Sequence, residues 1–328
     1  MKPFAHFNAR SVKEAVGLLT EYKGKAKLNA GGTDLLGLLK NSILPDYPKA
    51  IINIKTITGL DYIKEDTTGL KIGALSKLAD IARSPAVKGK YPLLSEAAHS
   101  VATPLIRNVA TIGGNLVQDV RCWYYRYPHQ IGGPVICRRK GGKTCNALAG
   151  DNRYHSIFGA AHGCVAVNPS DIGMALIALD ASIKTSQRTI DAQGFFTAGA
   201  TASTILDANE LVTEIQIPQP PQGARQHYLK FTLREPVDFA IVSVASFITL
   251  KEGICADARI ILGAVAPAPV RAGKAEEIIK GRPIDEASAD EAAKSALRNA
   301  KPLSRNAYKV EIAKALVKRA ILMEISCP

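Results

Sequence analysis

Aromatic residues and long apolar runs are both scarce in this chain of 328 residues. Phe, Trp and Tyr make up 6% of the sequence, with a single tryptophan, although apolar residues reach 47%. We therefore expect two or three domains with largely aliphatic cores. The longest apolar run, Phe239 to Leu250, is too short to cross a bilayer, and Met1 to Arg10 holds no apolar stretch typical of secretory signals. These absences predict a cytoplasmic protein that does not contact a membrane.

The net charge of +13 is not concentrated in a nucleic-acid-binding module, because the basic residues are spread along the chain. Two local groups stand out, one from Arg121 to Lys143 and one from Lys301 to Arg319. The second group fits either the solvated face of a helix or a docking surface for an acidic partner. No nucleophile with a matching base is evident. We expect no nucleic-acid partner and assign no catalytic residue.

Paired C-x2-C motifs, which are usual in structural zinc sites, are absent. Six cysteines in a cytosolic chain also argue against a disulfide framework. Four of them nevertheless fall within 43 residues, at Cys122, Cys137, Cys145 and Cys164. Four thiolates can hold a [4Fe–4S] cluster or a Zn²⁺ ion, and the spacing alone does not choose between them. Six Lys and Arg residues in the same stretch would offset the negative charge of a cluster, which favours iron–sulfur over zinc.

The first 56 residues predict a strand, a turn, a helix and a second strand. A capping box from Ser11 to Glu14 opens an amphipathic helix before them. Lys25 to Ala30 is typical of a short strand, Gly31 and Gly32 of a tight turn, Asp34 to Lys40 of a helix, and Ile51 to Ile54 of a buried strand.

Residues 57–222 form a second predicted segment. It begins with a hairpin over 61–74 and continues with helices at 78–83 and 93–101. A second Gly-Gly turn, Gly113 and Gly114, follows an extended stretch. Residues 120–164 then lose all periodicity, which in a compact domain indicates either function or disorder. A helix capped by Pro169-Ser170-Asp171 resumes regular structure.

Residues 223–328 form the third predicted segment. Apolar, β-rich runs at 228–233, 240–250 and 258–265 precede two or three helices, the last from Asn306 to about Glu324. This order predicts an antiparallel sheet with helices on one side. The chain as a whole is therefore expected to be α+β.

Each Gly-Gly turn has a plain reading and a functional one. Alone, such a turn is most often just a tight turn. Glycines also let a backbone approach phosphate closely and offer it free N–H groups. Neither turn matches G-x-G-x-x-G or G-x-x-x-x-G-K-[ST]. Two such turns in a β/α context favour a shared ligand.

Three stretches resemble the FAD-binding signatures of one family: residues 29–36, 106–115 and 169–172. Leu229-Lys230, Arg234, 238–240 and 262–267 resemble the C-terminal domain of the same proteins. The family is that of the FAD-binding medium subunits of xanthine dehydrogenase and carbon monoxide dehydrogenase, the molybdenum hydroxylases, and the likeness runs from about Phe4 to Ile321. It implies a two-subdomain FAD-binding fold of the PCMH/VAO type, with subdomains 1–56 and 57–222, and a C-terminal domain 223–328.

The resemblance also implies roles for single residues. The FAD pyrophosphate would be held by the first turn, comprising Asn29, Ala30, Gly31, Gly32, Thr33, Asp34, Leu35 and Leu36. The second loop, at the phosphate and flavin side, would comprise Thr111, Ile112, Gly113, Gly114 and Asn115. Asp171 would bind polar parts of the cofactor, Val101 and Val212 would line the site, and Lys230 would lie near the flavin. The plain alternatives are a helix N-cap for Asp171 and an exposed strand lysine for Lys230.

The cysteine-bearing insertion 120–164 resembles that of the 4-hydroxybenzoyl-CoA reductase β subunit, which carries an extra [4Fe–4S] cluster. The last cysteine spacing is longer here, so His155 or His162 are alternatives to Cys164 as fourth ligand. The implied function is electron relay between this FAD and a molybdopterin-binding large subunit through a [2Fe–2S] small subunit. A ferredoxin or another carrier would be the external partner, in a hetero-oligomer such as a dimer of heterotrimers.

Three alternatives stay open at this point. The complex could reduce an aroyl-CoA or oxidise an aldehyde, purine or other heterocycle, because the cofactor chain is the same in both directions. The cysteine loop could instead bind zinc or be purely structural. A self-sufficient flavin oxidase would turn over alone, whereas the family reading expects no substrate chemistry from this chain by itself.

Overall fold

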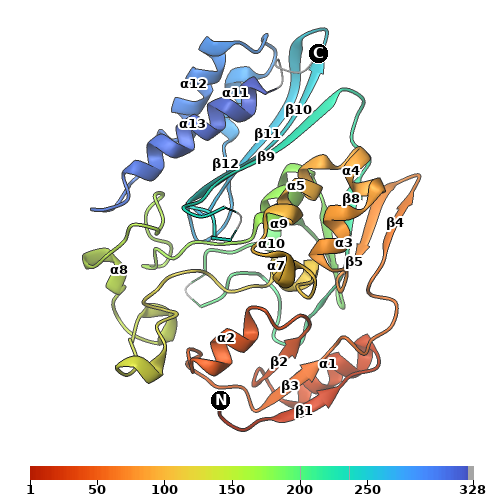
Figure 1. Cartoon of the computed structure of the whole chain (residues 1–328), viewed down its shortest axis with the longest axis vertical. Helices are drawn as coiled ribbons and strands as arrows, with labels where there is room; N and C mark the ends of the chain where they lie inside the picture. The colour runs from red at the N-terminus through yellow and green to blue at the C-terminus, as the bar shows by residue number, and fades with distance from the viewer. Residues whose placement is uncertain (200, 236, 324–328) are drawn as a thin grey trace.

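The computed structural model describes residues 1–199, 201–235 and 237–323, whose strands form three separate sheets (Figure 1). The N-terminal part contains β1 (Ala5–Asn8), α1 (Val12–Glu21), β2 (Ala26–Asn29), α2 (Leu35–Lys40) and β3 (Ala50–Asn53). The middle part contains β4 (Ile63–Asp66), β5 (Gly69–Gly73), α3 (Leu78–Arg83), α4 (Pro85–Lys90), α5 (Pro92–Ser100), α6 (Pro104–Arg107), α7 (Ile112–Leu116), η1 (His129–Ile131), η2 (Arg138–Lys140), α8 (Asn146–Ala149), α9 (Asp171–Ala178), β6 (Ser182–Thr185), β7 (Thr189–Asp191), α10 (Ala192–Phe195) and β8 (Val212–Pro218). The C-terminal part contains β9 (Ala224–Phe231), β10 (Val242–Lys251), β11 (Ile254–Gly263), β12 (Val270–Arg271), α11 (Gly273–Ile279), α12 (Glu286–Ala296) and α13 (Tyr308–Leu322).

The N-terminal sheet is parallel, in the order β1-β3-β2. The predicted cap is confirmed: Ser11 Oγ accepts the Glu14 N–H at 3.1 Å, which satisfies one of the free donors at the start of α1. The sequence did not predict β1, because it is only four residues long, which is too short to give a clear periodic signal.

The middle sheet is antiparallel, in the order β4-β5-β8-β6-β7. The predicted hairpin at 61–74 is confirmed as β4 and β5. The second Gly-Gly pair, however, is not a turn after an extended stretch. Gly113 and Gly114 lie in the first turn of α7, whose N-cap Thr111 accepts the Gly114 N–H at 3.1 Å. Because α6 precedes this segment, the chain there is largely helical.

The C-terminal sheet is antiparallel, in the order β12-β11-β10-β9, and helices α11 to α13 cover one face. Its other face packs on α5 and α9 of the middle part. Strand β10 therefore contributes Val244 and Ile248 to one core and Phe247 to another. Burial on both faces explains why this strand is a continuous apolar run and does not alternate. The end of the last predicted helix, near Glu324, lies outside the described residues.

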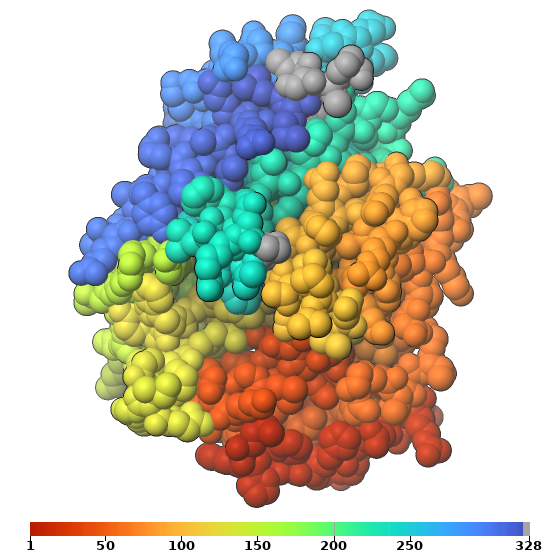
Figure 2. Space-filling view, viewed as in Figure 1, coloured from red at the N-terminus to blue at the C-terminus, as the bar shows by residue number. Residues whose placement is uncertain are grey.

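The insertion 120–164 has only short helical turns, η1, η2 and α8. Figure 2 shows it, in yellow and yellow-green, beside the red N-terminal part and below the blue C-terminal helices. The basic group around α13 is not simply a solvated face, because Lys309 is 0% exposed. Its Nζ donates to the carbonyl oxygens of His155 at 3.0 Å and Ala264 at 2.7 Å, so it ties the insertion to the C-terminal part. In the part of the chain that the structure describes, no helix combines the length and apolarity needed to span a membrane.

Candidate functional site

The two Gly-Gly segments, about 80 residues apart in sequence, meet in space. Gly31 lies so close to the segment before α7 that a Cβ on it would clash with the carbonyl oxygen of Val109. Beside this contact is a cavity of about 450 Å³, which is within the range of small-molecule sites. The cavity is lined by residues of the first turn, of α7 and of the segment before β8.

The first turn has the features of a phosphate cradle. Gly32 has a φ of +72°, a left-handed conformation that glycine adopts without strain. Among the described residues, no acceptor is found for the N–H groups of Gly31, Gly32 and Thr33. Within the same set, Asn29 Oδ1 is buried without a hydrogen-bond partner. Successive free N–H groups in such a turn bind anions, so these residues fit the pyrophosphate of a dinucleotide.

Eleven of the predicted site residues line this cavity. They are Asn29, Ala30, Gly31, Gly32, Thr33, Asp34, Leu35, Thr111, Gly113, Gly114 and Val212. Six do not: Leu36, Val101, Ile112, Asn115, Asp171 and Lys230. Ile112 is fully buried in the core of the middle part, and Leu36 faces solvent.

Asp171 and Lys230 form a buried cluster of their own. The carboxylate accepts from Lys230 Nζ at 2.8 Å and from the Tyr228 hydroxyl at 2.5 Å, and Lys230 Nζ also donates to the Ser100 carbonyl at 2.9 Å. Both plain alternatives are therefore wrong. Lys230 is buried against Asp171, and the N-cap of α9 is Ser170, whose Oγ accepts the Gly173 N–H at 2.9 Å. This cluster joins β9 to α9.

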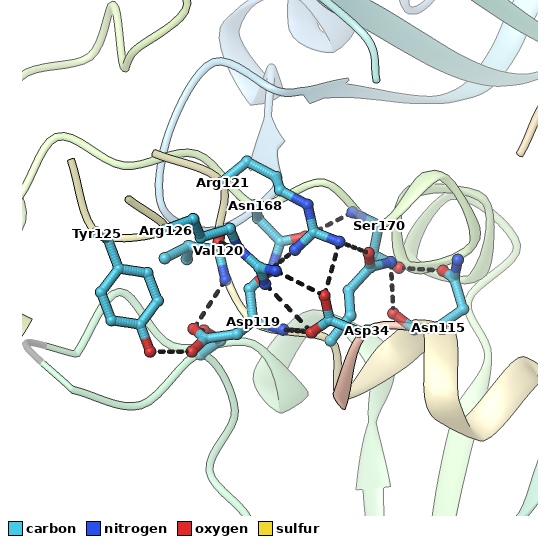
Figure 3. Close-up of polar contacts among 11 residues, drawn as sticks. Asp34, Asn115, Asp119, Val120, Arg121, Tyr125, Arg126, Asn168 and Ser170 are labelled. Atoms are coloured by element: carbon cyan, nitrogen blue, oxygen red, sulfur yellow. Dashed lines mark hydrogen bonds and ion pairs between the residues drawn. The ribbon is translucent and has the colours of Figure 1, made fainter. Parts of the chain in front are cut away.

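Asn115 connects this cluster to the cavity. Its Oδ1 accepts the Ser170 hydroxyl at 2.7 Å, one residue before Asp171 (Figure 3). The helix that carries Gly113 and Gly114 is thereby fixed to the helix that carries Asp171. Asn115, Asp171 and Lys230 thus form a group that adjoins and supports the eleven residues lining the cavity.

The partners of Asp34, which the sequence did not predict, come from the insertion and from Asp119 just before it. Arg121 Nη2 and Arg126 Nη1 each lie 2.9 Å from Asp34 Oδ1, and the Asp119 N–H donates to Asp34 Oδ2 at 3.0 Å (Figure 3). Burial raises the pKa of Asp34, but the two guanidinium groups outweigh it and hold that pKa below its ordinary value. Asp34 is therefore a carboxylate with two counter-charges at neutral pH.

The segment before β8 is a second part of the site that the sequence did not predict. Thr201, Ala202, Ser203 and Thr204 line the cavity, as do Gln118 and Asp119. Ser203 Oγ donates to Asp119 Oδ1 at 3.3 Å, which joins this segment to the start of the insertion. The run of small and polar residues at 201–204 is the only signal that could have suggested it.

The four insertion cysteines converge on one small region. Cys122, Cys137 and Cys164 share one apolar cluster with Val120 and Tyr125. The thiol of Cys164 donates to the sulfur of Cys145, which lowers the pKa of Cys145 and raises that of Cys164. Burial raises the pKa of Cys122 to about 11, although that thiol interacts electrostatically with Cys145 and Cys137. The four thiols, which are far apart in sequence, thus lie near one another in the folded insertion.

Backbone N–H groups surround these sulfurs. Cys122 accepts from Tyr124 and Tyr125, and Cys145 accepts from Ala147, Leu148 and Val165. Lys140 lies close enough to Cys137 and Cys122 to interact with their charge. Such donors stabilise thiolates and tune iron–sulfur clusters. Two of the six basic residues, Arg121 and Arg126, face Asp34 and not the thiols.

His155 lies at Cys122 and does not replace Cys164. Its Nε2 is 3.1 Å from Cys122 Sγ, and burial lowers its pKa to about 4, so the ring is neutral. Within residues 1–199, 201–235 and 237–323, no group of three or more His, Cys, Asp or Glu side chains has the spacing to hold a metal ion. The thiols are thus gathered and hydrogen-bonded, and they would have to lose protons and separate slightly to bind a cluster.

Comparison with known families covers nearly the whole chain. Residues 2–220 match the FAD binding domain in molybdopterin dehydrogenase, and residues 227–323 match the CO dehydrogenase flavoprotein C-terminal domain. The chain is 34% identical over 324 residues to the aldehyde oxidoreductase FAD-binding subunit PaoB of Escherichia coli, with 96% of each protein covered. It is 30% identical to the carbon monoxide dehydrogenase medium chain of Hydrogenophaga pseudoflava, over 97% of this chain and 96% of that one.

A solved structure agrees with these matches. Carbon monoxide dehydrogenase from Hydrogenophaga pseudoflava, in a form that lacks the Mo-pyranopterin moiety, superposes on this chain with a TM-score of 0.78. The identity is 29%, and 99% of both chains is covered. The likeness confirms the predicted fold, an FAD-binding domain followed by an antiparallel sheet with helices.

Proposed function

Because the chain belongs to the family of FAD-binding subunits of molybdopterin dehydrogenases, we propose that it is the electron-transfer subunit of a multi-subunit molybdenum-dependent oxidoreductase. The observation that carries this proposal is the cavity between the two Gly-Gly segments, with three free N–H groups at its first turn. FAD bound there would accept two electrons together and release them singly.

The chain's own residues would bind and orient the flavin. The N–H groups of Gly31, Gly32 and Thr33 would hold the pyrophosphate, and Asn29 Oδ1 would accept from the cofactor. Thr111, Gly113 and Gly114 would form the opposite wall with Val212. Asp171 and Lys230 would act from behind this wall, through Ser170 and Asn115, by keeping α7 and α9 in register.

We propose further that Cys122, Cys137, Cys145 and Cys164 bind a [4Fe–4S] cluster. The convergence of four thiols, five backbone N–H donors to two of them and a neighbouring lysine supports this assignment. Zinc needs all its donors about 2.3 Å from one point, whereas a cluster binds each thiolate at a different iron. The zinc-binding or purely structural loop remains the competing function for this segment.

Partner subunits would supply the remaining chemistry. A large molybdopterin-binding subunit would act on the substrate, and a small [2Fe–2S] subunit would connect it to this chain. Relatives named for aldehyde oxidoreductase, carbon monoxide dehydrogenase and xanthine dehydrogenase favour an oxidative dehydrogenase. We therefore prefer that class over 4-hydroxybenzoyl-CoA reduction. A ferredoxin or similar one-electron carrier would be the external partner.

Anaerobic purification with cofactor analysis tests both cofactors at once. We expect one FAD and about four irons per chain, with broad absorption near 400 nm that bleaches with dithionite. One zinc without iron would support the competing function, and a colourless protein would contradict the proposal as a whole.

Substitution of a single thiol tests the ligand assignment. Cys137→Ser should lose iron and still bind FAD when FAD is in excess, because Cys137 does not line the flavin cavity. Cys255→Ser is the matched control, since Cys255 is also buried but lies in β11, outside the insertion. Full iron content in Cys137→Ser would remove that cysteine from the ligand set.

A further inference from the structure

Two arginines of the cysteine insertion end at the flavin turn. Asp34 lies two residues after the Gly-Gly pair and lines the flavin cavity. Its carboxylate is held by Arg121 and Arg126 at 2.9 Å each, and all three side chains are less than one-fifth exposed. Figure 3 shows both guanidinium groups pointing at this carboxylate. Arg121 and Arg126 also line a second cavity, of about 590 Å³, next to Cys122 and His155. The ion pairs thus lie between the flavin cavity and the thiols.

One short turn positions both Arg126 and the sulfur of Cys122. The Arg126 N–H donates to the Cys122 carbonyl at 2.9 Å, while the N–H groups of Tyr124 and Tyr125 donate to the Cys122 sulfur. Arg126 Nε donates to the Val120 carbonyl at 2.8 Å. A displacement of the Cys122 sulfur would therefore displace the guanidinium that contacts Asp34.

The sign of the local charge gives this contact a consequence. A carboxylate beside three free N–H groups would repel the pyrophosphate of FAD. Two arginines change the net charge of the group from −1 to +1, counting Asp34, Arg121 and Arg126. The neighbouring carboxylate of Asp119 is paired with Arg139 at 3.6 Å, so that pair adds no net charge. Because these side chains are mostly buried, solvent and salt screen the interaction only weakly. The insertion thus supplies the charge that makes the first turn attractive to an anion.

We propose that the cysteine insertion sets the affinity for FAD by holding Arg121 and Arg126 on Asp34, so that iron–sulfur loading and flavin binding are coupled. The inference rests on the proposed flavin and cluster sites. Arg121 and Arg126 are positioning residues in it, since they act through Asp34. Coupling between two sites is reciprocal, so FAD should strengthen retention of iron by the same factor. We expect a factor of about ten, within the usual range of about 5 to 150.

The first experiment is FAD titration of the purified chain, followed by flavin fluorescence. Arg126→Gln should raise the Kd for FAD about tenfold, and Arg126→Lys should recover part of the loss because it keeps one charge. In the Asp34→Asn background the effect of Arg126→Gln should shrink, since less negative charge is left to neutralise. Arg282→Gln is the matched control. That arginine pairs with Glu291 at 3.5 Å on the surface, with both side chains more than half exposed.

The second experiment compares iron-loaded with chelator-treated wild-type protein under anaerobic conditions. Iron-free wild-type protein should bind FAD about tenfold more weakly than iron-loaded protein. This difference in affinity should disappear in Arg126→Gln and should be smaller in Arg126→Lys. Equal FAD affinity with and without iron would overturn the coupling, as would an Arg126→Gln protein that folds and binds FAD like wild type.

Failure of the underlying sites is visible before any substitution is made. Wild-type protein that binds no FAD refutes the flavin site, and wild-type protein that never holds iron refutes the cluster; either result also ends the coupling. An unchanged FAD affinity in Arg126→Gln, with wild-type FAD and iron contents normal, refutes the coupling alone.

Discussion

Lys309→Met removes a buried ammonium group that fastens the cysteine insertion to α13. Lys309 Nζ donates to the carbonyl oxygens of Tyr154, His155 and Ala264, at 3.4, 3.0 and 2.7 Å. Within the described part of the chain, Lys309 forms no salt bridge with a carboxylate, whereas Lys314 and Lys318 of the same helix do. Methionine fills a similar volume and is apolar, but it leaves these carbonyl oxygens without this donor. At pH 7 we expect a loss of about 1–3 kcal/mol in the free energy of unfolding.

The dependence of this loss on pH is the sharper prediction. Burial lowers the pKa of Lys309 to about 7, from an ordinary value of about 10.4. Between these two values the unfolded chain binds a proton that the folded protein has released. The free energy of unfolding of the wild type should therefore be constant well below pH 7, where both states are protonated. It should rise with pH between the two pKa values. One pKa unit corresponds to about 1.4 kcal/mol, so the gain from pH 7 to 9 is at most about 2–3 kcal/mol.

Urea denaturation at pH 7, 8 and 9, in excess FAD and at fixed protein concentration, measures this difference. The wild type should gain stability relative to Lys309→Met as the pH rises. Lys314→Met is the control on the same helix, because Lys314 is partly exposed and pairs with Glu311 at 2.8 Å. Wild-type and Lys309→Met curves that run parallel over this pH range would refute the reasoning, since the buried amine would then titrate as it does in water.

Two further substitutions test the site. Asp171→Asn leaves Lys230 largely buried without a counter-charge and should lower the free energy of unfolding by about 3–5 kcal/mol. Urea denaturation measures this loss, with Asp290→Asn, a variant of an exposed ion pair, as the control. A loss below about 1 kcal/mol would contradict the buried cluster. Gly31→Ala puts a methyl group into the Val109 carbonyl and should weaken FAD binding at least about tenfold, while Gly37→Ala, which has open space around it, should not. FAD titration decides this, and equal affinities would show that the two Gly-Gly segments need not touch.

Local signals in the sequence predicted most of the regular structure. The cap at Ser11 was recognised because its partner lies three residues away, whereas for α9 only the capping segment 169–171 was recognised and not Ser170 itself. The apolar run that ends at Leu250 was correctly assigned to a strand. It does not alternate, because both faces of this strand are buried. The short exposed strand β1 was missed and the helical start of the second Gly-Gly segment was misread, because elements of four or five residues are too short to show a clear period.

The site residues also divide into those with a recognisable local motif and those that only the fold brings to the cavity. Residues 29–35 of the first turn, with Thr111, Gly113 and Gly114, were identified by their resemblance to a family and do line the cavity. The segment at 201–204, which lines it too, was missed because small polar residues are common in any loop. Its contribution depends on a fold that brings it back to Asp119.

By itself, then, the sequence determined most of the secondary structure, the family and the cysteine-rich insertion, since all of these depend on neighbouring residues or on matched motifs. Only the tertiary structure decided which charges are buried and what they face. Arg126 meets Asp34 across 92 residues of chain, and Lys309 meets His155 across 154. A charged side chain looks the same in sequence whether it is solvated or buried. Its environment is set by segments that reach it only after the chain has folded.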